Sequence, residues 1–153
     1  MPLPSTTSRV ERNTSDAVNE RIRARTEANV IYFTEHPHEI DERLIELDQE
    51  WDIERTLEAN ASTIGIASVA LGALVSKRWL FLPFAVSGFL LQHALQGWCP
   101  PVAVFRRQGV RTMKEINEER IALKVLRGDF EGLSDAGELT GRQRAKKALQ
   151  MVR

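Results

Sequence analysis

The sequence has a single cysteine and no net charge, and it lacks the short motifs that mark most enzymes. With Cys99 as the one cysteine among 153 residues, an intramolecular disulfide framework and a multi-cysteine zinc site are excluded. The 21 basic and 21 acidic residues cancel, whereas a dedicated nucleic-acid-binding protein concentrates basic residues on one face. No glycine-rich phosphate loop, nucleophile elbow or paired acid and base is present. We therefore predict no cofactor, no metal site and no nucleic-acid partner.

The middle of the chain lacks charge. Between Glu58 and Arg106 the only fixed charges are Lys77 and Arg78, and the other 40 charged residues lie outside. The apolar runs on the two sides of this basic pair are each close to the length that crosses a bilayer. Trp79 and Trp98 bracket the second run, as aromatic residues do at membrane interfaces. Residues 59–105 are thus predicted to form a two-helix membrane hairpin with a tight basic turn.

The charges outside this stretch are segregated by sign. Residues 1–58 carry fourteen acids and seven bases, and residues 76–153 carry fourteen bases and seven acids. Opposite halves of this kind predict that the two polar arms attract each other or a protein partner. Six bases flank the open ends of the hairpin and two mark its turn, which predicts that both termini are cytoplasmic. The six are Arg43, Arg55, Arg106, Arg107, Arg111 and Lys114.

The remaining segments give an all-α fold with four parts. Residues 1–14 are rich in Pro, Ser and Thr and are predicted to be a disordered leader. Residues 15–58 form an N-terminal helical arm, broken near Pro37. We expect its last helix to run without a break into the apolar segment. Residues 106–153 form a basic C-terminal helical arm, in which Thr112 and Thr140 each open a helix through a capping box.

Two helical faces in the hairpin suit close packing. Small residues recur on one face of the first apolar helix, and a glycine and two amides recur on one face of the second. In lipid, such faces allow close approach of helices and amide hydrogen bonds between them. We predict that the second face meets the first helix or a second copy of the chain. The residues are Ala61, Gly65, Ser68 and Gly72 in the first helix and Gly88, Gln92 and Gln96 in the second.

A heptad-like spacing in the N-terminal arm predicts a seam for packing against another helix. Ile40, Leu44, Leu47 and Trp51 recur at i, i+4, i+7 and i+11. We assign this seam to contacts between copies of the chain, as a homodimer or a higher homo-oligomer.

Cys99 is the one candidate for a catalytic nucleophile. We place it at the C-terminal end of the second apolar helix, followed by an extended exit at Pro100 and Pro101. The dipole at a helix C-terminus disfavours a thiolate, so a packing role is favoured over catalysis. His93, at membrane depth, is interpreted as a neutral hydrogen-bonding group between helices.

The chain resembles the YgaP-like transmembrane domain family over about residues 51–112. The marks of this resemblance are Glu54-Arg55 before the first apolar helix and Gly97-x-Cys99-Pro100 after the second. The family consists of small bacterial inner-membrane hairpins, some of them fused to a rhodanese domain. The resemblance implies a homodimeric two-helix hairpin with both ends cytoplasmic. It also implies, by analogy with the fused rhodaneses, persulfide or thiocyanate handling at Cys99.

Three functional hypotheses follow. The leading one is a non-enzymatic protein of the bacterial inner membrane, which self-associates in lipid and serves as a scaffold or recruits a partner. The second is a membrane sulfur or persulfide relay that uses Cys99. The third is a soluble helical oligomer that buries the hairpin in its core, and the polar residues of the first apolar helix keep this hypothesis open.

Overall fold

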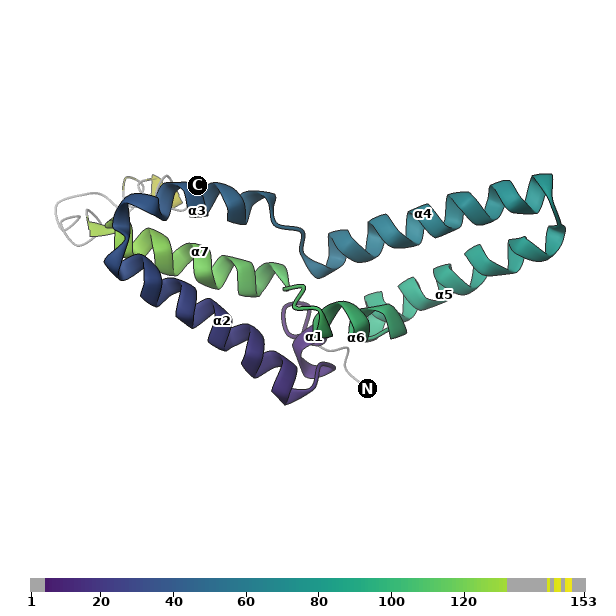
Figure 1. Ribbon diagram of the computed structural model, residues 1–153, viewed down its shortest axis with the longest axis horizontal. Coiled ribbons are helices and arrows are strands. Elements are labelled where there is room, and N and C mark those ends of the chain that lie inside the picture. Colours follow the sequence, from purple (N-terminus) through teal and green to yellow (C-terminus); the bar gives the residue numbers. More distant parts are fainter. Residues whose placement is uncertain (1–4, 132–142, 144, 147, 150–153) are drawn as a thin grey trace. The chain divides into compact units, whose positions relative to one another are not determined.

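The computed structural model describes residues 5–131, 143, 145, 146, 148 and 149. Within these residues the chain is helical and has no strand, so the prediction of an all-α protein is confirmed for them. The second predicted capping box, at Thr140, lies outside the described residues. The elements in chain order are α1 (Arg9–Arg12), α2 (Asp16–Glu35), η1 (Pro37–Glu39), α3 (Ile40–Gln49), α4 (Ile53–Leu74), η2 (Lys77–Leu80), α5 (Phe81–Gln96), α6 (Pro100–Arg107) and α7 (Met113–Arg127) (Figure 1).

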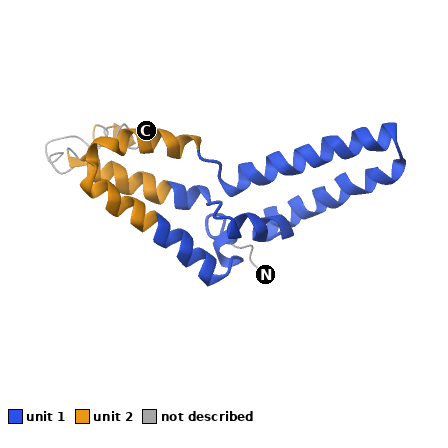
Figure 2. Ribbon diagram, viewed as in Figure 1, with its two compact units in different colours: residues 1–25, 50–116 blue, residues 26–49, 117–153 orange. Residues whose placement is uncertain are grey.

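The chain divides into two compact units that do not follow the boundaries of the predicted arms. The first unit comprises residues 1–25 and 50–116, and the second comprises residues 26–49 and 117–153 (Figure 2). Helices α2 and α7 each begin in the first unit and end in the second. The apolar helices α4 and α5 therefore share a unit with α1, α6 and the connections around them.

Helices α4 and α5 lie side by side and antiparallel, joined by η2 (Figure 1). The side chain of Ser76 caps η2 by accepting from the backbone N–H of Arg78. On α4 the covered face carries the small residues, since Ser68 and Gly72 are buried. A Cβ atom at Gly72 would lie 2.5 Å from Cδ2 of Leu80, so the glycine leaves room for the returning chain.

The face predicted for packing on α5 is not fully buried at any of its three positions within this chain, so its contact with a second copy stays a prediction. Gly88 and Gln96 are exposed and Gln92 is only half-buried. Val86 and Leu90 are likewise half-buried, and His93 is buried. Because small residues on α4 leave space, larger side chains on α5 can fill it, and two small faces need not meet.

Helix α4 has its own N-terminus, which corrects the expectation of a continuous helix from the acidic arm. Residues 50–52 are not helical, and the carboxylate of Asp52 accepts from the backbone N–H of Arg55 at 2.9 Å. The N–H of Ile53 donates to the carbonyl of Arg111 at 2.8 Å. An aspartate N-cap stabilises a helix start by about 1 kcal/mol, so the break is built into the sequence.

The predicted disordered leader contains an ordered element. Residues Arg9–Arg12 form α1, and Val10 is buried. The side-chain amide of Asn13 donates to the carbonyl of Gln96 at 2.9 Å. A single helical turn has no periodicity to detect and is marginal alone in water. Its order here depends on contacts with residues far along the chain.

Cys99 lies at the start of a helix, whereas the sequence predicted that it follows the end of one with an extended exit. Gly97, with φ of 77°, ends α5 in the left-handed conformation and donates to the carbonyl of His93. Pro100 and Pro101 then occupy the first helical positions of α6, where a missing N–H is tolerated. The chain turns sharply here, and the segments Lys77–Gln96 and Pro100–Arg107 meet at 70°.

Arg106 on α6 is a buried cation that is bonded on every side of its guanidinium. Its two terminal nitrogens donate to both carboxylate oxygens of Glu115, at 2.6 and 2.8 Å. Further bonds reach the carbonyl of Val110, the amide oxygen of Asn19 and the hydroxyl of Thr14. Only 1% of the arginine is exposed. The network joins α6 to the start of α7, to Thr14 just before α2 and to Asn19 in the first turn of α2.

Glu115 also completes the capping box predicted at the start of α7. Its carboxylate accepts from the N–H of Thr112 at 2.7 Å, and its own N–H donates to the hydroxyl of Thr112 at 3.3 Å. This prediction is confirmed. Helix α7 ends before Gly128, whose φ is 87°.

In the second unit, the seam predicted for contacts between copies is used inside the chain. Ile40, Leu44 and Leu47 are buried, as are Phe33 of α2 and Leu123 of α7. The fourth seam residue, Trp51, is half exposed and lies beyond the end of α3. The assignment of this seam to an oligomer is therefore corrected. The heptad spacing correctly indicated a helix-packing face but could not identify its partner.

A buried carboxylate accompanies this small core. Glu119 of α7 is fully buried and accepts from Nε of Arg43 at 2.9 Å and from the amide of Asn29 at 3.2 Å. Arg120 donates to the carbonyl of Leu47. These bonds tie together α2, α3 and α7.

We predict that Arg106→Leu destabilises the protein by about 3–5 kcal/mol, because Glu115 would remain buried without its partner. The measurement is the free energy of unfolding in detergent, followed by circular dichroism. Arg107→Leu is the matched control, since Arg107 is adjacent and exposed. Equal stability of the two variants would contradict the role assigned to the network.

Candidate functional site: the base of the helical hairpin

A cluster of charged and polar groups lies at the base of the hairpin formed by α4 and α5. Glu54, in the first turn of α4, accepts from Arg9 at 2.7 Å through one carboxylate oxygen. The other oxygen accepts from Nε2 of His93 at 2.8 Å. His93 is buried, and its Nδ1 atom has no hydrogen-bond partner within the described part of the chain. The cluster thus connects α1, α4 and α5.

The pKa of Glu54 is lowered from its ordinary value. The main cause is the hydrogen bond from His93, and the charges of His93 and Arg9 act in the same direction against the opposing effect of burial. Glu54 is therefore held as a carboxylate, which stabilises the contact between the start of α4 and the last turn of α5.

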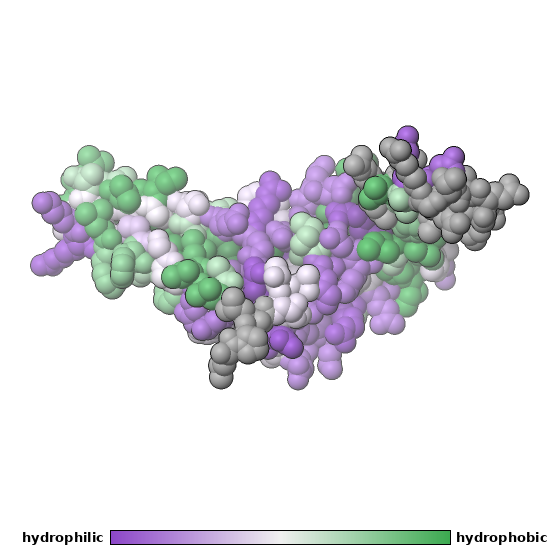
Figure 3. All heavy atoms as spheres, turned by 180° about the vertical axis from the view of Figure 1, so that it is seen from behind, coloured by the Kyte–Doolittle hydropathy of each residue, from purple (hydrophilic) through white to green (hydrophobic). Residues whose placement is uncertain are grey.

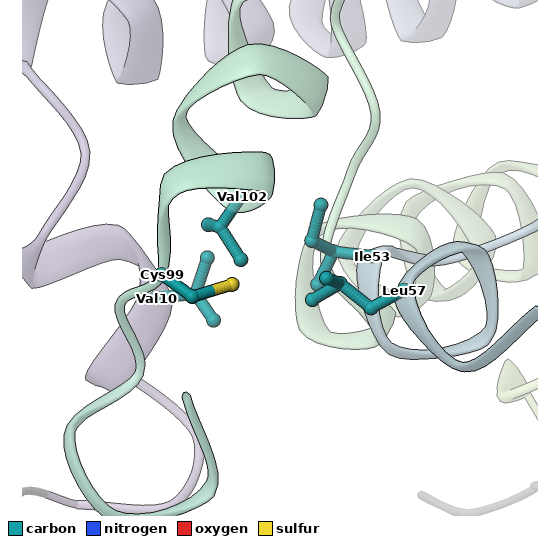
Figure 4. Packing of buried hydrophobic residues seen from close by; sticks show 5 residues of the cluster. All are labelled: Val10, Ile53, Leu57, Cys99 and Val102. Carbon is teal, nitrogen blue, oxygen red and sulfur yellow. The ribbon is translucent and has the colours of Figure 1, made fainter. Parts of the chain in front are cut away.

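Next to this cluster is a small apolar core made of Val10, Ile53, Leu57, Cys99 and Val102. Figure 4 shows the Cys99 sulfur pointing toward the side of Ile53 and Leu57, with Val10 and Val102 nearby. Phe105 and Val110 pack against this group. These residues come from α1, α4, α6 and the connections that flank α6.

The surroundings of Cys99 favour packing over chemistry. Its position at the N-terminus of α6 would favour a thiolate through the helix dipole. However, only 1% of the residue is exposed, and its neighbours are apolar. Reactive cysteines lie in partly exposed, electropositive surroundings, whereas buried cysteines in apolar clusters are inert. In addition, the side chain makes no capping hydrogen bond to α6. The geometry supports the packing role.

Among the described residues, no group of three or more His, Cys, Asp or Glu side chains is arranged to hold a metal ion. The His93 and Glu54 pair therefore stands beside a guanidinium and apolar side chains. No further side chain in the described residues joins this pair to form a metal site.

Above the base, the hairpin exposes large apolar side chains. Leu74 is 85% exposed, Phe84 is 76% exposed and Ile66 is 74% exposed. Figure 3 shows green, hydrophobic residues covering much of the hairpin, with hydrophilic residues at the end where α4 turns into α5. This surface has no cover in the described chain. The other apolar residues of the hairpin that are at least 43% exposed are Ile64, Val69, Val75, Trp79, Leu80, Phe81, Phe89, Leu91 and Leu95.

By length and composition, one stretch in the described residues, Pro37–Leu74, which includes the break at residues 50–52, is a candidate membrane span. Only 22% of its most apolar window is buried, whereas the core helix of a soluble protein is mostly buried. The bent pair Lys77–Gln96 and Pro100–Arg107 passes the same criteria as one broken span.

Sequence reasoning missed the ion pairs at the base. Arg9 lies in the predicted leader and Glu54 among the acids of the N-terminal arm, and the two residues lie 45 positions apart. Neither has a local pattern that identifies its partner. Arg111, which was counted only as a flanking base, pairs with Glu50 at 2.6 Å. Two acids of the N-terminal arm, Glu50 and Glu54, are therefore paired with bases within the first unit.

Comparisons of the chain with protein-family models, curated proteins and solved structures find no match. The resemblance to the YgaP-like family stays a prediction.

We predict that Glu54 contributes stability that is lost in acid. Because its folded-state pKa is below the unfolded value of about 4.3, the contribution is complete above that value and falls as the pH drops through the lowered pKa. The measurement is the thermal midpoint in detergent as the pH decreases from about 6 to about 3. Glu54→Gln should flatten the acid limb of this profile. Glu58→Gln, an exposed acid one turn later, is the control and should leave the limb unchanged.

We further predict that Cys99 is alkylated more slowly than a free model thiol and that Gly97→Ala accelerates the reaction. At Gly97 a Cβ atom would lie 2.6 Å from backbone and side-chain atoms of Arg9. The positive φ adds about 1–2 kcal/mol of strain for alanine. Displacement of α1 would uncover the core that contains Cys99.

The control for this experiment is Gly88→Ala, because a Cβ atom at Gly88 meets nothing within 4 Å. Maleimide labelling followed by mass spectrometry gives the rates. Fast labelling of the unaltered protein, with transfer of sulfane sulfur from a polysulfide to Cys99 to give a persulfide and a shorter polysulfide, would contradict the packing role and support the sulfur relay.

Proposed function

We propose that this protein is a non-enzymatic membrane-hairpin scaffold, with the part of the hairpin from residue 59 in α4 to the end of α5, which is uncharged except at its turn, in the lipid of the bacterial inner membrane. The observation that carries the proposal is the exposed apolar surface of the hairpin, of which Leu74, Phe84 and Ile66 are the most open examples. A soluble monomer rarely leaves a contiguous apolar surface of this extent in water. Lipid covers such a surface at no cost in polar desolvation.

The length of α5 agrees with this proposal. The sixteen residues of α5 span about 24 Å at 1.5 Å per residue, and the hydrocarbon core of a bilayer is about 30 Å thick. Trp79 and Leu80, at the turn, are exposed and extend the apolar length. Lys77 and Arg78 are exposed at the same turn and would contact the far headgroups.

Hydroxyl side chains in the hairpin have hydrogen-bond partners, which polar groups need in lipid. In α4 the hydroxyls of Thr63 and Ser68 donate to the carbonyls of the residues four positions earlier, and in α5 Ser87 does the same. These polar side chains are therefore satisfied within their own helices. No buried charge lies between Glu58 and His93.

The charge distribution supports an orientation with both termini in the cytoplasm. Two bases lie at the turn, while the open end of the hairpin is flanked by Arg55, Arg107 and their neighbours. An excess of basic residues marks the cytoplasmic side. The ordered base and the second unit would then be cytoplasmic, where they can recruit a protein partner.

Self-association in this proposal uses the outward face of α5. Gly88 is exposed, and a Cβ atom there meets nothing within 4 Å. Phe84 and Leu91 lie on the same face at i−4 and i+3 and are also exposed. An exposed glycine between large residues lets a second helix approach closely in lipid. This site replaces the seam on α3, which is buried within the chain.

The test of membrane insertion is extraction of membranes with alkaline carbonate. The full chain is expected to stay in the membrane pellet. A variant with charges on the apolar face, Ile66→Lys with Phe84→Lys, should be released, because each lysine costs about 2.5–3.5 kcal/mol at the bilayer centre. The matched control places the same charges on the exposed second-unit residues Ile45 and Ile121 and should stay in the pellet. Release of the unaltered chain would contradict insertion.

The mass of the protein in mild detergent tests self-association. A dimer or larger species is expected, and Gly88→Ile should shift it toward the monomer. Ala94→Ile, at another exposed position on α5, is the control. A monodisperse oligomer that needs no detergent would instead favour the soluble-oligomer hypothesis.

A further inference from the structure

Helix α6 turns away from the hairpin and presents a fixed outward face. The segments Lys77–Gln96 and Pro100–Arg107 meet at 70°. Transmembrane helices tilt by about 20° from the bilayer normal on average. If α5 crosses the membrane as proposed above, α6 runs closer to the membrane plane than to the normal, immediately outside the span.

The rotation of α6 about its own axis is determined by its buried side. Val102 and Arg106 are each 1% exposed, and the guanidinium of Arg106 is bound to Glu115, Asn19 and Thr14. Residues on the opposite side must therefore face outward. That side is exposed at Pro100, Val104 and Arg107, which recur at i, i+4 and i+7.

The outward side is apolar at its start and cationic at its end. Pro100, Pro101 and Val104 are exposed, and Val104 retains 51% of its surface in the open. Trp98 precedes them and is 37% exposed. Arg107 follows them with an exposed side chain. Aromatic, aliphatic and basic groups in this order suit the boundary between acyl chains and anionic headgroups.

A second element at the base has the same chemistry. The guanidinium of Arg55 lies 4.5 Å from the centre of the Trp51 ring, and Trp51 is half exposed. Trp51 precedes α4 just as Trp98 follows α5. Each end of the hairpin therefore has an exposed tryptophan with an exposed arginine within nine positions of it in the sequence.

We propose that α6 is an interfacial helix, which lies on the cytoplasmic leaflet of the bilayer that holds the hairpin and binds anionic lipid headgroups through Arg107. This inference rests on the proposed function. The occupant of the exposed α6 face is lipid, because the bend directs α6 along the surface of that bilayer and the face ends in a base. A basic residue near an anionic leaflet is attracted to its headgroups.

The experiment measures depth at three positions in the full chain. On a Cys99→Ala background, whose folding is checked by circular dichroism, single cysteines replace Phe84, Val104 or Ile121 and receive a fluorescent label. The protein is reconstituted in phosphatidylcholine vesicles with or without phosphatidylglycerol. Quenching is measured with lipids that carry a doxyl group near the carbonyl or near the methyl end, and with aqueous iodide.

The expected result is a separate quenching pattern for each position. The Phe84 label should be quenched most by the deep doxyl group, and the Val104 label by the shallow one. The Ile121 label, on the exposed part of α7, should be quenched by iodide alone. Arg107→Gln should cause a loss of shallow quenching at Val104 in anionic vesicles, with a smaller loss in phosphatidylcholine.

Three other results overturn the inference in distinguishable ways. If the Val104 label behaves like the Ile121 label while the Phe84 label is deep, the hairpin is inserted and α6 is not interfacial. If the Val104 label is protected from iodide without any doxyl quenching, a second copy of the chain covers the face. If the Phe84 label is accessible to iodide, the proposed membrane function fails, and the inference fails with it.

Discussion

The fold of the first unit depends on one buried cation. A guanidinium in a protein interior is costly unless it is paired and fully hydrogen-bonded, and Arg106 meets both conditions through Glu115, Asn19, Thr14 and the Val110 carbonyl. The bidentate pair with Glu115 is among the strongest and most directional interactions available to side chains. Burial alone would raise the pKa of Glu115, but the hydrogen bonds from Arg106 and Thr112 together outweigh it and hold the pKa below its ordinary value. Since these partners lie on three different segments, the bonds fix the position of α6 without a large apolar core.

This arrangement explains how a chain of ordinary overall composition can combine a polar, ion-paired base with an apolar outer surface on α4 and α5. The base of the hairpin is stabilised by ion pairs, including Glu54 with Arg9 and Glu50 with Arg111, and its apolar core is small. The large apolar side chains are instead on the outside of α4 and α5. Hydrophobic residues that would normally stabilise the fold from within are thus available for an external apolar phase. The proposal of insertion in lipid rests on this separation, in which polar contacts stabilise the base and the apolar side chains face outward.

Features with a local cause were predictable from the sequence, and features set by distant partners were not. The capping box of Thr112 and Glu115, the end of α7 at Gly128 and the small-residue face on α4 each depend on residues within a few turns of one another. The order of α1 was missed because a single turn is stabilised only by tertiary contacts. The seam on α3 was recognised as a packing face, but spacing cannot tell a partner in the same chain from one in another. The Asp52 cap was a local signal, and the continuous helical periodicity around it concealed it.

The segment from Gly97 to Pro101 shows why residues that resemble a sulfur-handling motif need not carry chemistry. The chain must leave the direction of α5 and enter α6 at 70° within a few residues. Gly97 permits the left-handed conformation and the close approach of Arg9, and the prolines start a helix that needs no N–H donors in its first turn. Cys99, between them, is a small apolar side chain that fits the space beside Val10 and Val102. Each named residue of the Gly-x-Cys-Pro sequence thus has a geometric role, because the turn requires a glycine at 97, leaves space for a small buried side chain at 99 and accommodates a proline at the first position of α6.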